Sequence, residues 1–387
     1  MLEKTGSRSL ARDVSNRSRA PLNIRRVDAI AVALPLKAPM KMANALITAA
    51  QNILVRIEAS DGTVGWGEAA SAPTMTGDTL GGLVAAVRDH LGPALIGKDA
   101  WQRPELMREL RHALLGNPGA HSAVEMALLD LAGHAAGVPL IELLTKPRRA
   151  AVKPMWLLGN ATSDQDIDEA RTRQQEGFNF FKLKIGVKPI ETEIKTALAV
   201  REALGAKTPL CADANCGLTV VTARRYIEKT RPAKLMFVEQ PLAHDDLAGL
   251  KTLTKGLRMP VGIDEGIHAI ADIETSARYG AGGVSLKLIK VGGISAALEA
   301  GKLCKKLGLS INIAAKIAES SIASAAATHL ACAVPSVDWG VSLTHFYLAH
   351  DLVKRPLALG DGLVRLPAAP GLGVEVDEAA VARFTVH

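Results

Sequence analysis

Apolar positions at the start of the chain follow first the period of a strand and then that of a helix. Residues 24–68 alternate between apolar and polar side chains, and Asp61-Gly62 supplies a hairpin turn between two expected strands. Between residues 79 and 144, apolar positions recur at helical spacing, and Gly137-Val138-Pro139 separates a long helix from a short one. The pattern predicts a small α+β module ahead of the rest of the fold.

From Val152 onward, short apolar runs alternate with helical stretches. The first of these helices is expected to begin at the capping sequence Thr162-Ser163-Asp164 and to stop at Gly177. A doubly wound open sheet would show the same alternation, but no glycine-rich nucleotide turn follows the first run. A closed parallel barrel of the TIM type needs eight strands. Eight runs are present, at residues 153–158, 180–185, 209–213, 235–239, 261–264, 284–287, 309–313 and 336–340.

The predicted fold class is therefore α/β, a TIM-like barrel with an additional α+β module. We expect a basic tail without fixed structure at residues 1–22, an α+β capping domain at 23–148 and the barrel with the active site at 149–350. The last segment, residues 351–387, has hairpin character again. It is expected to pack back on the capping domain.

Five ionisable residues mark the ends of consecutive runs in the predicted barrel. They are Lys184, Asp213, Glu239, Asp264 and Lys287, and they follow one another at intervals of 23 to 29 residues. A strand, a helix and two loops occupy about 25 to 30 residues, so this spacing places one charged group at the carboxyl end of each strand. Three carboxylates without histidine or thiolate among them suit Mg²⁺. The pattern predicts a metal site with a lysine base on either side.

Composition narrows the classes of partner. The net charge of +7 comes largely from residues 1–26, which hold seven Lys or Arg and two acidic residues, so the expected folded part is near neutral. Nucleic-acid binding is therefore disfavoured, and no apolar stretch is long enough for a membrane span. The leading segment lacks the apolar core of a signal peptide, although its Arg and Ser content would also suit an organelle transit peptide. Four cysteines are too few for a disulfide framework, and reduced thiols predict a cytoplasmic protein.

The sequences around the charged residues resemble the enolase superfamily, specifically its muconate lactonizing enzyme subgroup (mandelate racemase/muconate lactonizing enzyme-like proteins). The resemblance covers the chain from about residue 24 to the end. It implies a (β/α)7β form of the barrel, capped by the N-terminal module, and a homo-oligomer, either a dimer or an octamer. The motifs that carry it are Lys182-Leu183-Lys184, Asp213-Ala214-Asn215, Glu239-Gln240-Pro241-Leu242, Asp264-Glu265 and Ser285-Leu286-Lys287.

The resemblance also implies an activity, that of a Mg²⁺-dependent isomerase with Mn²⁺ as a substitute metal and a small-molecule carboxylate as substrate. Asp213, Glu239 and Asp264 would hold the metal. Lys184 and Lys287 would remove or return the proton on the carbon next to the carboxylate, through an ene-diolate. A neighbouring cation lowers the pKa of a lysine base. The expected substrate-binding or ligand-orienting residues are Lys182, Asn215, Glu265 and Glu319.

The sequence leaves the exact reaction open. A muconate-type cycloisomerase or a racemase fits best, and the alternative is a dehydratase of a hydroxy or cyclic amino acid, or an N-acylamino acid racemase or epimerase. Val337-Asp338-Trp339-Gly340 lacks the second aspartate by which family dipeptide epimerases hold an ammonium group. Residues 71–78 lack the tyrosine usual in muconate cycloisomerases, and this loop and a loop at 40–50 are expected to set specificity. A non-enzymatic binding module is disfavoured, because none of the five charged positions is missing.

Four further polar residues near these motifs receive simpler interpretations. Cys211 and Cys216 straddle Asp213 and are expected to be packing residues beside the site. Lys290 is expected to be a solvated lysine that pairs with the carboxylates, and His268 is the histidine expected to reach the pocket.

Overall fold

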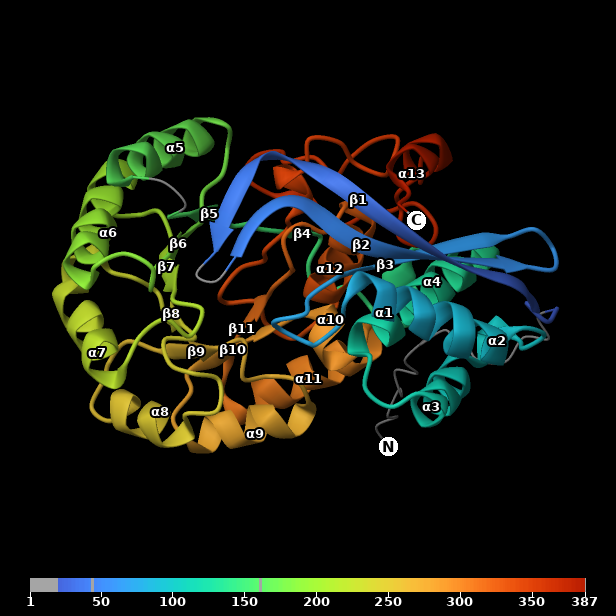
Figure 1. Cartoon of the computed structure of the whole chain (residues 1–387), viewed down its shortest axis with the longest axis horizontal. Helices are drawn as coiled ribbons and strands as arrows, with labels where there is room; N and C mark the ends of the chain where they lie inside the picture. Colours follow the sequence, from blue (N-terminus) through green and yellow to red (C-terminus); the bar gives the residue numbers. More distant parts are fainter. Residues whose placement is uncertain (1–19, 43–44, 160–161, 387) are drawn as a thin grey trace, which may run out of the picture.

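The computed structural model describes residues 20–42, 45–159 and 162–386. Figure 1 shows two joined parts, a curled parallel sheet ringed by helices and an antiparallel sheet that carries helices of its own. The expected α/β fold, a TIM-like barrel with an α+β cap, is confirmed. No helix in these described ranges is long and apolar enough to cross a membrane.

The cap is built on a three-stranded antiparallel sheet of β1 (Ile24–Met42), β2 (Ala45–Ala59) and β3 (Val64–Ala70). The predicted turn at Asp61-Gly62 joins β2 to β3, and Gly62 adopts a φ of 87° that favours glycine. Residues 40–50, expected to be a loop, mostly belong to the β1–β2 hairpin. An irregularity between Pro35 and Met40 shifts the register, after which pairing resumes and extends the ladder.

The helices of the cap follow the sheet in sequence, and the longest packs directly on β3. They are α1 (Leu80–Ala85), α2 (Gly92–Leu95), α3 (Arg103–Ala113) and α4 (Pro118–Ala136). A Cβ atom at Gly67 would lie 1.9 Å from the carbonyl oxygen of Ala123, so the close approach of α4 requires glycine there. As predicted, Gly137 ends α4 in a left-handed conformation before a short 3₁₀ turn at Leu140–Leu143.

Seven parallel strands form the barrel sheet in sequence order. They are β5 (Trp156–Leu158), β6 (Phe181–Lys184), β7 (Leu210–Asp213), β8 (Val238–Glu239), β9 (Val261–Ile263), β10 (Gly283–Leu286) and β11 (Ser310–Ile313). The helices outside them are α5 (Ser163–Gln175), α6 (Ile190–Leu204), α7 (Val220–Lys229), α8 (Leu247–Thr254), α9 (Ile270–Arg278), α10 (Leu288–Val291), α11 (Ile294–Leu307) and α12 (Ser321–Ala333). Thr162 caps α5 and Gly177 follows its end, as predicted.

The eighth barrel position differs from the prediction of a strand at residues 336–340. Val341 bridges to Pro154, just before β5, on one side and to Ile313 of β11 on the other, and the Trp339 N–H also donates to the carbonyl oxygen of Ile311 in β11. Gly340, with a φ of 77°, bends the backbone just before this bridge and prevents a longer strand. The ring is closed by the end of the expected run and by Val341, the residue that follows it.

Trp339 fills the barrel interior below the site. Its ring stacks on Phe237 at a centroid distance of 4.0 Å and an interplanar angle of 9°. A Cβ atom at Gly283 would lie 2.5 Å from the Trp339 ring, and one at Gly262 would lie 2.8 Å from it. Glycine in two neighbouring strands therefore makes the room for this indole.

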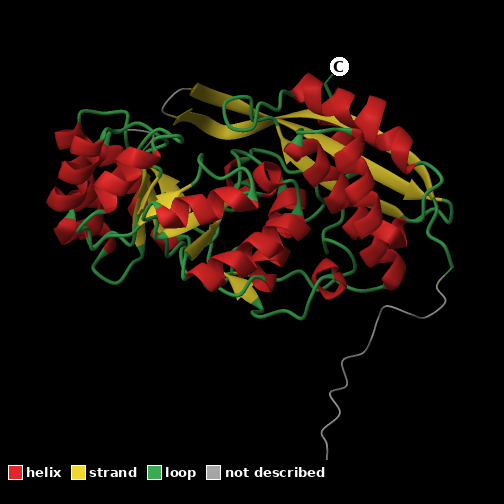
Figure 2. Cartoon of the chain, turned by 90° about the horizontal axis from the view of Figure 1, so that it is seen from below, coloured by secondary structure: helices red, strands yellow, loops and turns green. Residues whose placement is uncertain are grey.

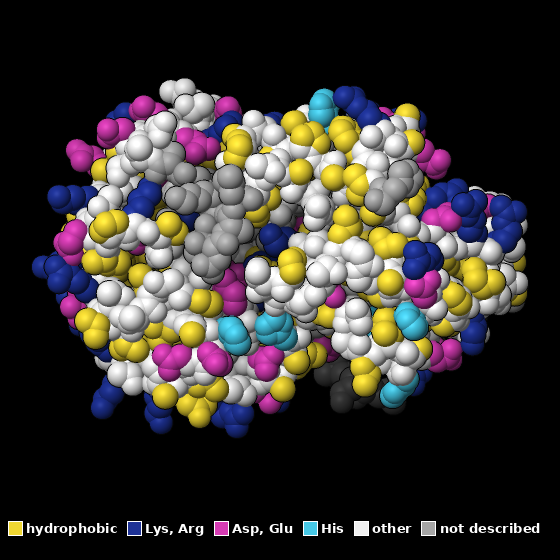
Figure 3. Space-filling model, viewed as in Figure 1, with side chains coloured by type: hydrophobic (Ala, Val, Ile, Leu, Met, Phe, Trp, Pro, Cys, Tyr) yellow, Lys and Arg dark blue, Asp and Glu magenta, His cyan; other side chains and the backbone are white. Residues whose placement is uncertain are grey.

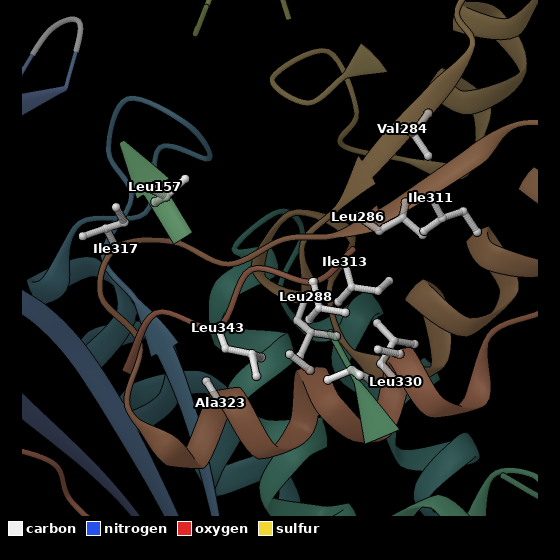
Figure 4. Close-up of a cluster of buried hydrophobic side chains, with 14 of the residues drawn as sticks. Leu157, Val284, Leu286, Leu288, Ile311, Ile313, Ile317, Ala323, Leu330 and Leu343 are labelled. Atoms are coloured by element: carbon white, nitrogen blue, oxygen red, sulfur yellow. The ribbon is translucent and has the colours of Figure 1, made fainter. Parts of the chain in front are cut away.

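A larger apolar cluster joins the barrel to α12 and the final loops. Figure 4 shows Leu286 and Ile313 of the barrel beside Leu330 of α12 and Leu343, and all four side chains are buried. Because these residues come from separate elements, the cluster fixes the loops that follow β10 and β11. Those loops contribute residues to a cavity at the barrel mouth.

The C-terminal segment returns to the cap, where Figure 2 places the C-terminus beside the antiparallel sheet. The short strand β12 (Val364–Arg365) pairs with β4 (Ala151–Val152), at the start of the barrel. Helix α13 (Glu378–Phe384) follows, and Thr385 then bridges to Val32 in β1. The cap is therefore completed by residues from both ends of the described chain.

Candidate active site

A cavity of about 360 Å³ lies at the carboxyl ends of the barrel strands. The β1–β2 hairpin contributes Ile47 to its wall, and the following loop of the cap contributes Thr74 and Met75. In Figure 3, basic, acidic and histidine side chains gather near the middle of the face shown. The predicted residues that line the cavity are Lys182, Lys184, Asp213, Asn215, Glu239, Asp264, Glu265 and Lys287. The structure thus brings together all the predicted site residues except Glu319.

The three carboxylates predicted as metal ligands end neighbouring strands. Asp213 of β7 lies opposite Glu239 of β8 in the register, and Glu239 lies opposite Gly262, two residues before Asp264. All three side chains are buried. Parallel strands end at one edge of the sheet, so these oxygen ligands converge at the barrel mouth.

Each of these carboxylates makes an ion pair with a lysine. The Lys184 Nζ lies 2.6 Å from Asp213 Oδ2, and the Lys287 Nζ lies 2.5 Å from Asp264 Oδ2. Lys182 donates a hydrogen bond to Glu239. Lys184 and Lys287 therefore reach the carboxylates from the two outer strands of the group, β6 and β10.

Burial and neighbouring charges set the pKa values of the three carboxylates. Burial would raise the pKa of Asp213, but the lysine charges of Lys184 and Lys182 outweigh it and the net shift is downward. Burial raises the pKa of Glu239, and the charges of Asp213 and Asp264 raise it further against the effect of Lys182. The close packing of like charges is the condition that a cation would relieve.

The pKa of Lys287 is set by burial and by its ion pair with Asp264. Burial would lower its pKa, but the carboxylate of Asp264 outweighs burial and raises the pKa above its usual value. The lowered pKa that is expected for a lysine base beside another cation stays a prediction.

Lys290 corrects the sequence-based interpretation most clearly. Its expected pairing with a carboxylate is present, since its Nζ lies 2.6 Å from Asp264 Oδ1, but the side chain is 1% exposed and is not solvated. The same ammonium also donates to the Asp264 carbonyl oxygen. Helix α10 begins directly after Lys287, and its first turn directs Lys290 back under the strand end. Two lysines hold the pKa of Asp264 far below its usual range, against the opposing effect of burial.

Asn215 links Lys184 at the end of β6 to Glu265 after β9. Its Oδ1 accepts a hydrogen bond from Lys184 Nζ at 2.8 Å, and its Nδ2 donates to Glu265 Oε1 at 2.8 Å. Burial raises the pKa of Glu265 to about 7, with further contributions from Asp264 and Asp213. Asn215 thus holds both Lys184 and Glu265, and the role of Asn215 and Glu265 in orienting metal ligands stays a prediction.

Two residues that orient the carboxylates were missed by the sequence argument, although both belong to its quoted motifs. Ser285 donates from its hydroxyl to Glu239 Oε1 at 2.8 Å. Gln240 accepts the backbone N–H of Asp264 at 2.9 Å and that of Gly266 at 3.2 Å, so it fixes the loop that carries Asp264. Their positions directly beside charged residues were the available signal.

Glu319 lies behind the cavity and is not among the described residues that line it. Its Oε1 accepts the backbone N–H of Lys316 at 3.3 Å. Burial raises the pKa of Glu319 to about 8, and the charge of Glu68 adds to the effect. Lys316 does line the cavity and was missed, because a lone lysine after the seventh strand carries no motif.

The histidines and cysteines near the site divide between wall and core. His268 lines the cavity as expected, and His244 lines it as well. Cys216 is part of the wall, whereas Cys211 is fully buried behind Lys182, and burial raises the pKa of the Cys216 thiol to about 12. Neither thiol is poised as a nucleophile at neutral pH.

The chemistry of the donor set fits a hard divalent cation. Asp213, Glu239 and Asp264 offer only oxygen, from adjacent strand ends, in a buried site. Within the described ranges, no three His, Cys, Asp or Glu side chains are already grouped as a metal site. The carboxylates point to lysines instead, and these pairs hold the negative charges in the arrangement described.

Comparison with known families identifies the chain. Residues 24–145 match the family model "Mandelate racemase / muconate lactonizing enzyme, N-terminal domain", and residues 165–380 match "Enolase C-terminal domain-like". The chain belongs to the mandelate racemase/muconate lactonizing enzyme family. This membership confirms the predicted placement in the enolase superfamily and its muconate lactonizing enzyme subgroup. Enzymes of this subgroup depend on a metal ion.

Relatives within the family carry out different isomerisations. Muconate cycloisomerase 1 of Rhodococcus opacus is 31% identical, covering 94% of this chain and 99% of that one, and L-Ala-D/L-Glu epimerase of Bacillus subtilis is 30% identical over 91% and 97%. A solved muconate lactonizing enzyme of Pseudomonas fluorescens, complexed with muconolactone, superposes with a TM-score of 0.91 at 27% identity over 95% of this chain and 100% of that chain. The chain is thus an enolase-superfamily isomerase. Its sequence identity to the epimerase and to the cycloisomerase is nearly the same, so the comparison does not select one reaction.

Proposed function

We propose that this family member is a Mg²⁺-dependent isomerase, a cycloisomerase or a racemase, that removes or returns the proton next to a substrate carboxylate. The observation that carries the proposal is the placement of Lys184 and Lys287 around one cavity. Their strands, β6 and β10, are separated by the three strands that carry the carboxylates on one side and by β11 and β5 on the other. Two amino groups can therefore approach a bound carbon from opposite faces.

The chain's own residues divide the work of this reaction. Asp213, Glu239 and Asp264 would hold Mg²⁺, with Mn²⁺ as a substitute. When bound, the ion supplies positive charge that stabilises the negative charge developing on the substrate carboxylate. Lys182, beside Glu239, contributes a further positive charge on the same wall.

The lysine bases are oriented by the groups they contact. Asn215 Oδ1 and Asp213 Oδ2 hold the Lys184 ammonium from two directions, at 2.8 and 2.6 Å. Lys287 is held by Asp264, and its Nζ also lies 3.7 Å from the sulfur of Met75 in the cap. The cap therefore touches one base directly and would exclude water from the reacting carbon.

The proposal is tested by proton exchange with solvent. The metal-loaded enzyme is incubated with a panel of carboxylates in deuterated water, and deuterium at the α-carbon is measured by mass spectrometry. Lys184→Ala and Lys287→Ala should each slow exchange by at least about 100-fold, as expected for loss of a general base. Lys302→Ala, an exposed lysine on α11, serves as the control. Undiminished exchange in both active-site variants would contradict the proposal.

The same panel separates the candidate reactions. A racemase converts one enantiomer to the other and exchanges the α-proton with solvent. A cycloisomerase forms a lactone without losing water, whereas a dehydratase releases water and lowers the mass of the product accordingly. The cycloisomerase assignment is supported by similarity to two muconate-converting relatives, and the racemase assignment by the 25% identical N-succinyl Arg/Lys racemase of Bacillus cereus, with a TM-score of 0.90.

We further infer a cytoplasmic homo-oligomer, a dimer or octamer, whose domain limits are those expected from the sequence. The four cysteines are free thiols, which supports a reducing compartment. Light scattering after gel filtration measures the assembly. Limited proteolysis near residues 22, 148 and 350 tests the domain limits, since linkers are cleaved first.

A further inference from the structure

Lys316 differs from the other lysines of the cavity wall. Lys182, Lys184 and Lys287 each make an ion pair with a carboxylate. Among the residues that the structure describes, the Lys316 ammonium makes neither an ion pair nor a hydrogen bond. An ammonium group in a partly enclosed site binds an anion more strongly than it would in open water.

The backbone of Lys316 is fixed on both sides. Its carbonyl oxygen accepts the hydroxyl of Thr344 at 2.8 Å, and that hydroxyl also accepts the backbone N–H of Glu319 at 2.9 Å. The next residues are tied to the cap, since Ser320 donates to Glu68 from its backbone and its hydroxyl. The loop after β11 therefore presents this side chain from a rigid support.

The charges around the cavity favour a substrate with more than one negative charge. Four lysines and four acidic residues line the wall, so the protein's own formal charges balance there. A divalent cation held by the three carboxylates would make the balance positive. A carboxylate bound at that end neutralises part of this charge, and Lys316 then offers a cation without a carboxylate partner.

We propose that Lys316 is a specificity-determining residue, whose ammonium binds a second anionic group of the substrate, beyond the carboxylate at the metal site. This inference rests on the proposed function, because it assumes that the first carboxylate lies at Asp213, Glu239 and Asp264. It assigns the second anion to the loop after β11 and not to the loops of the cap.

The protonation of Lys316 is consistent with this role near neutral pH. Burial and the neighbouring charge of Lys287 lower the pKa of Lys316 to about 8, while Glu319 acts in the opposite direction. The amine is therefore mostly charged at pH 7 and mostly neutral at pH 9. An added negative charge close to it would favour the ammonium form.

The test measures binding without turnover. Calorimetry on the Mg²⁺-loaded protein compares unbranched dicarboxylates, from succinate to pimelate, with their methyl half-esters. The wild-type protein should prefer at least one dicarboxylate to its half-ester. Lys316→Met should weaken binding of that dicarboxylate by about 10- to 100-fold, the range for loss of a charged hydrogen bond, and leave the half-ester unchanged. Lys316→Arg, which keeps the charge, should retain most of the preference, and Lys302→Met is the surface control.

Two outcomes would overturn the proposal. One is that no dicarboxylate in the series binds more tightly than its half-ester. The other is that Lys316→Met weakens both members of a pair equally. α-Proton exchange is measured separately. A Lys316→Met enzyme that exchanges the α-proton at the normal rate and still prefers the dicarboxylate to its half-ester therefore contradicts this inference alone. Undiminished α-proton exchange in Lys184→Ala and Lys287→Ala would contradict the proposed function instead.

Discussion

Lys290 and Asp264 form a buried ion pair beneath the active-site cavity, with the ammonium bound to both the carboxylate and the carbonyl oxygen of the same residue. Lys287 binds the other carboxylate oxygen at 2.5 Å. Asp264 is thus held between one lysine on the cavity wall and one below it. The lower lysine is a fixed part of the fold that shapes the site without lining it.

Lys290→Met should destabilise the protein. The substitution leaves a buried carboxylate with one cation in place of two, and we expect the free energy of unfolding to fall by about 3 kcal/mol. Urea unfolding followed by circular dichroism measures the change. Lys302→Met, which removes an exposed pair with Glu299, should cost less than about 1 kcal/mol. Equal effects of the two substitutions on the free energy of unfolding would show that the buried pair stabilises the protein no more than the exposed pair does.

Ser285→Ala should weaken metal binding. The Ser285 hydroxyl holds one oxygen of Glu239 at 2.8 Å while Lys182 holds the other. Without this hydrogen bond the carboxylate is less well oriented, and residues in such positions typically change metal affinity by about 10- to 100-fold. Calorimetric titration with Mg²⁺ measures the effect, with Ser60→Ala in the cap as control. Unchanged Mg²⁺ affinity would show that the Ser285 hydroxyl does not contribute to metal binding.

Glu68→Gln should loosen the contact between the cap and the barrel. The buried carboxylate accepts hydrogen bonds from Asn52, from Ser320 and from the backbone of Ala323. A glutamine amide accepts hydrogen bonds only through its oxygen, so its NH₂ group would face donors in place of the second carboxylate oxygen. We expect the free energy of unfolding to fall by about 2 to 4 kcal/mol. Urea unfolding measures the loss, and limited proteolysis should cut the variant faster at the cap. Wild-type stability and cleavage would exclude Glu68 as an anchor.

The free energy of unfolding should depend on pH through Glu319. Burial and Glu68 raise its pKa to about 8 in the folded protein, against an ordinary value of 4.5. Between these values the folded state holds a proton that the unfolded state has lost. Stability should therefore fall as pH rises from about 4.5 to about 8, by up to about 1.4 kcal/mol per pH unit.

Glu319→Gln isolates this contribution from those of other groups. The difference in stability between variant and wild type should grow in favour of the variant as pH rises through the same window. The charges that act on Glu319 are Glu68, Lys287 and Lys316, and they are present in both proteins. A pH-independent difference would mean that the carboxyl group is ionised throughout.

The sequence predicted those parts of the fold that local patterns encode. The cap on α5 at Thr162, the turn at Gly62 and the end of α4 at Gly137 all depend on neighbouring residues, and each was found in place. The closing of the barrel depends instead on Val341, a single residue paired with two distant segments. No local periodicity marks a bridge of that length.

The site shows the same division between local and distant causes. Charged residues at strand ends were recognisable, because the strand period and the spacing both place them at the barrel mouth. Lys290 was misjudged because its burial depends on how the first turn of α10 meets Asp264. Lys316 was missed because the anchors of its loop, Thr344 and Glu68, are far away in sequence.

The pairing of Val32 with Thr385 also bears on how the protein is made. Ribosomes release β1 before the barrel, yet its partner at this position, Thr385, emerges only after the barrel. The cap cannot be completed while the barrel is still being synthesised. The barrel must therefore tolerate an unfinished neighbour during translation, and a nascent chain stopped before residue 351 should lack the native edge of β1.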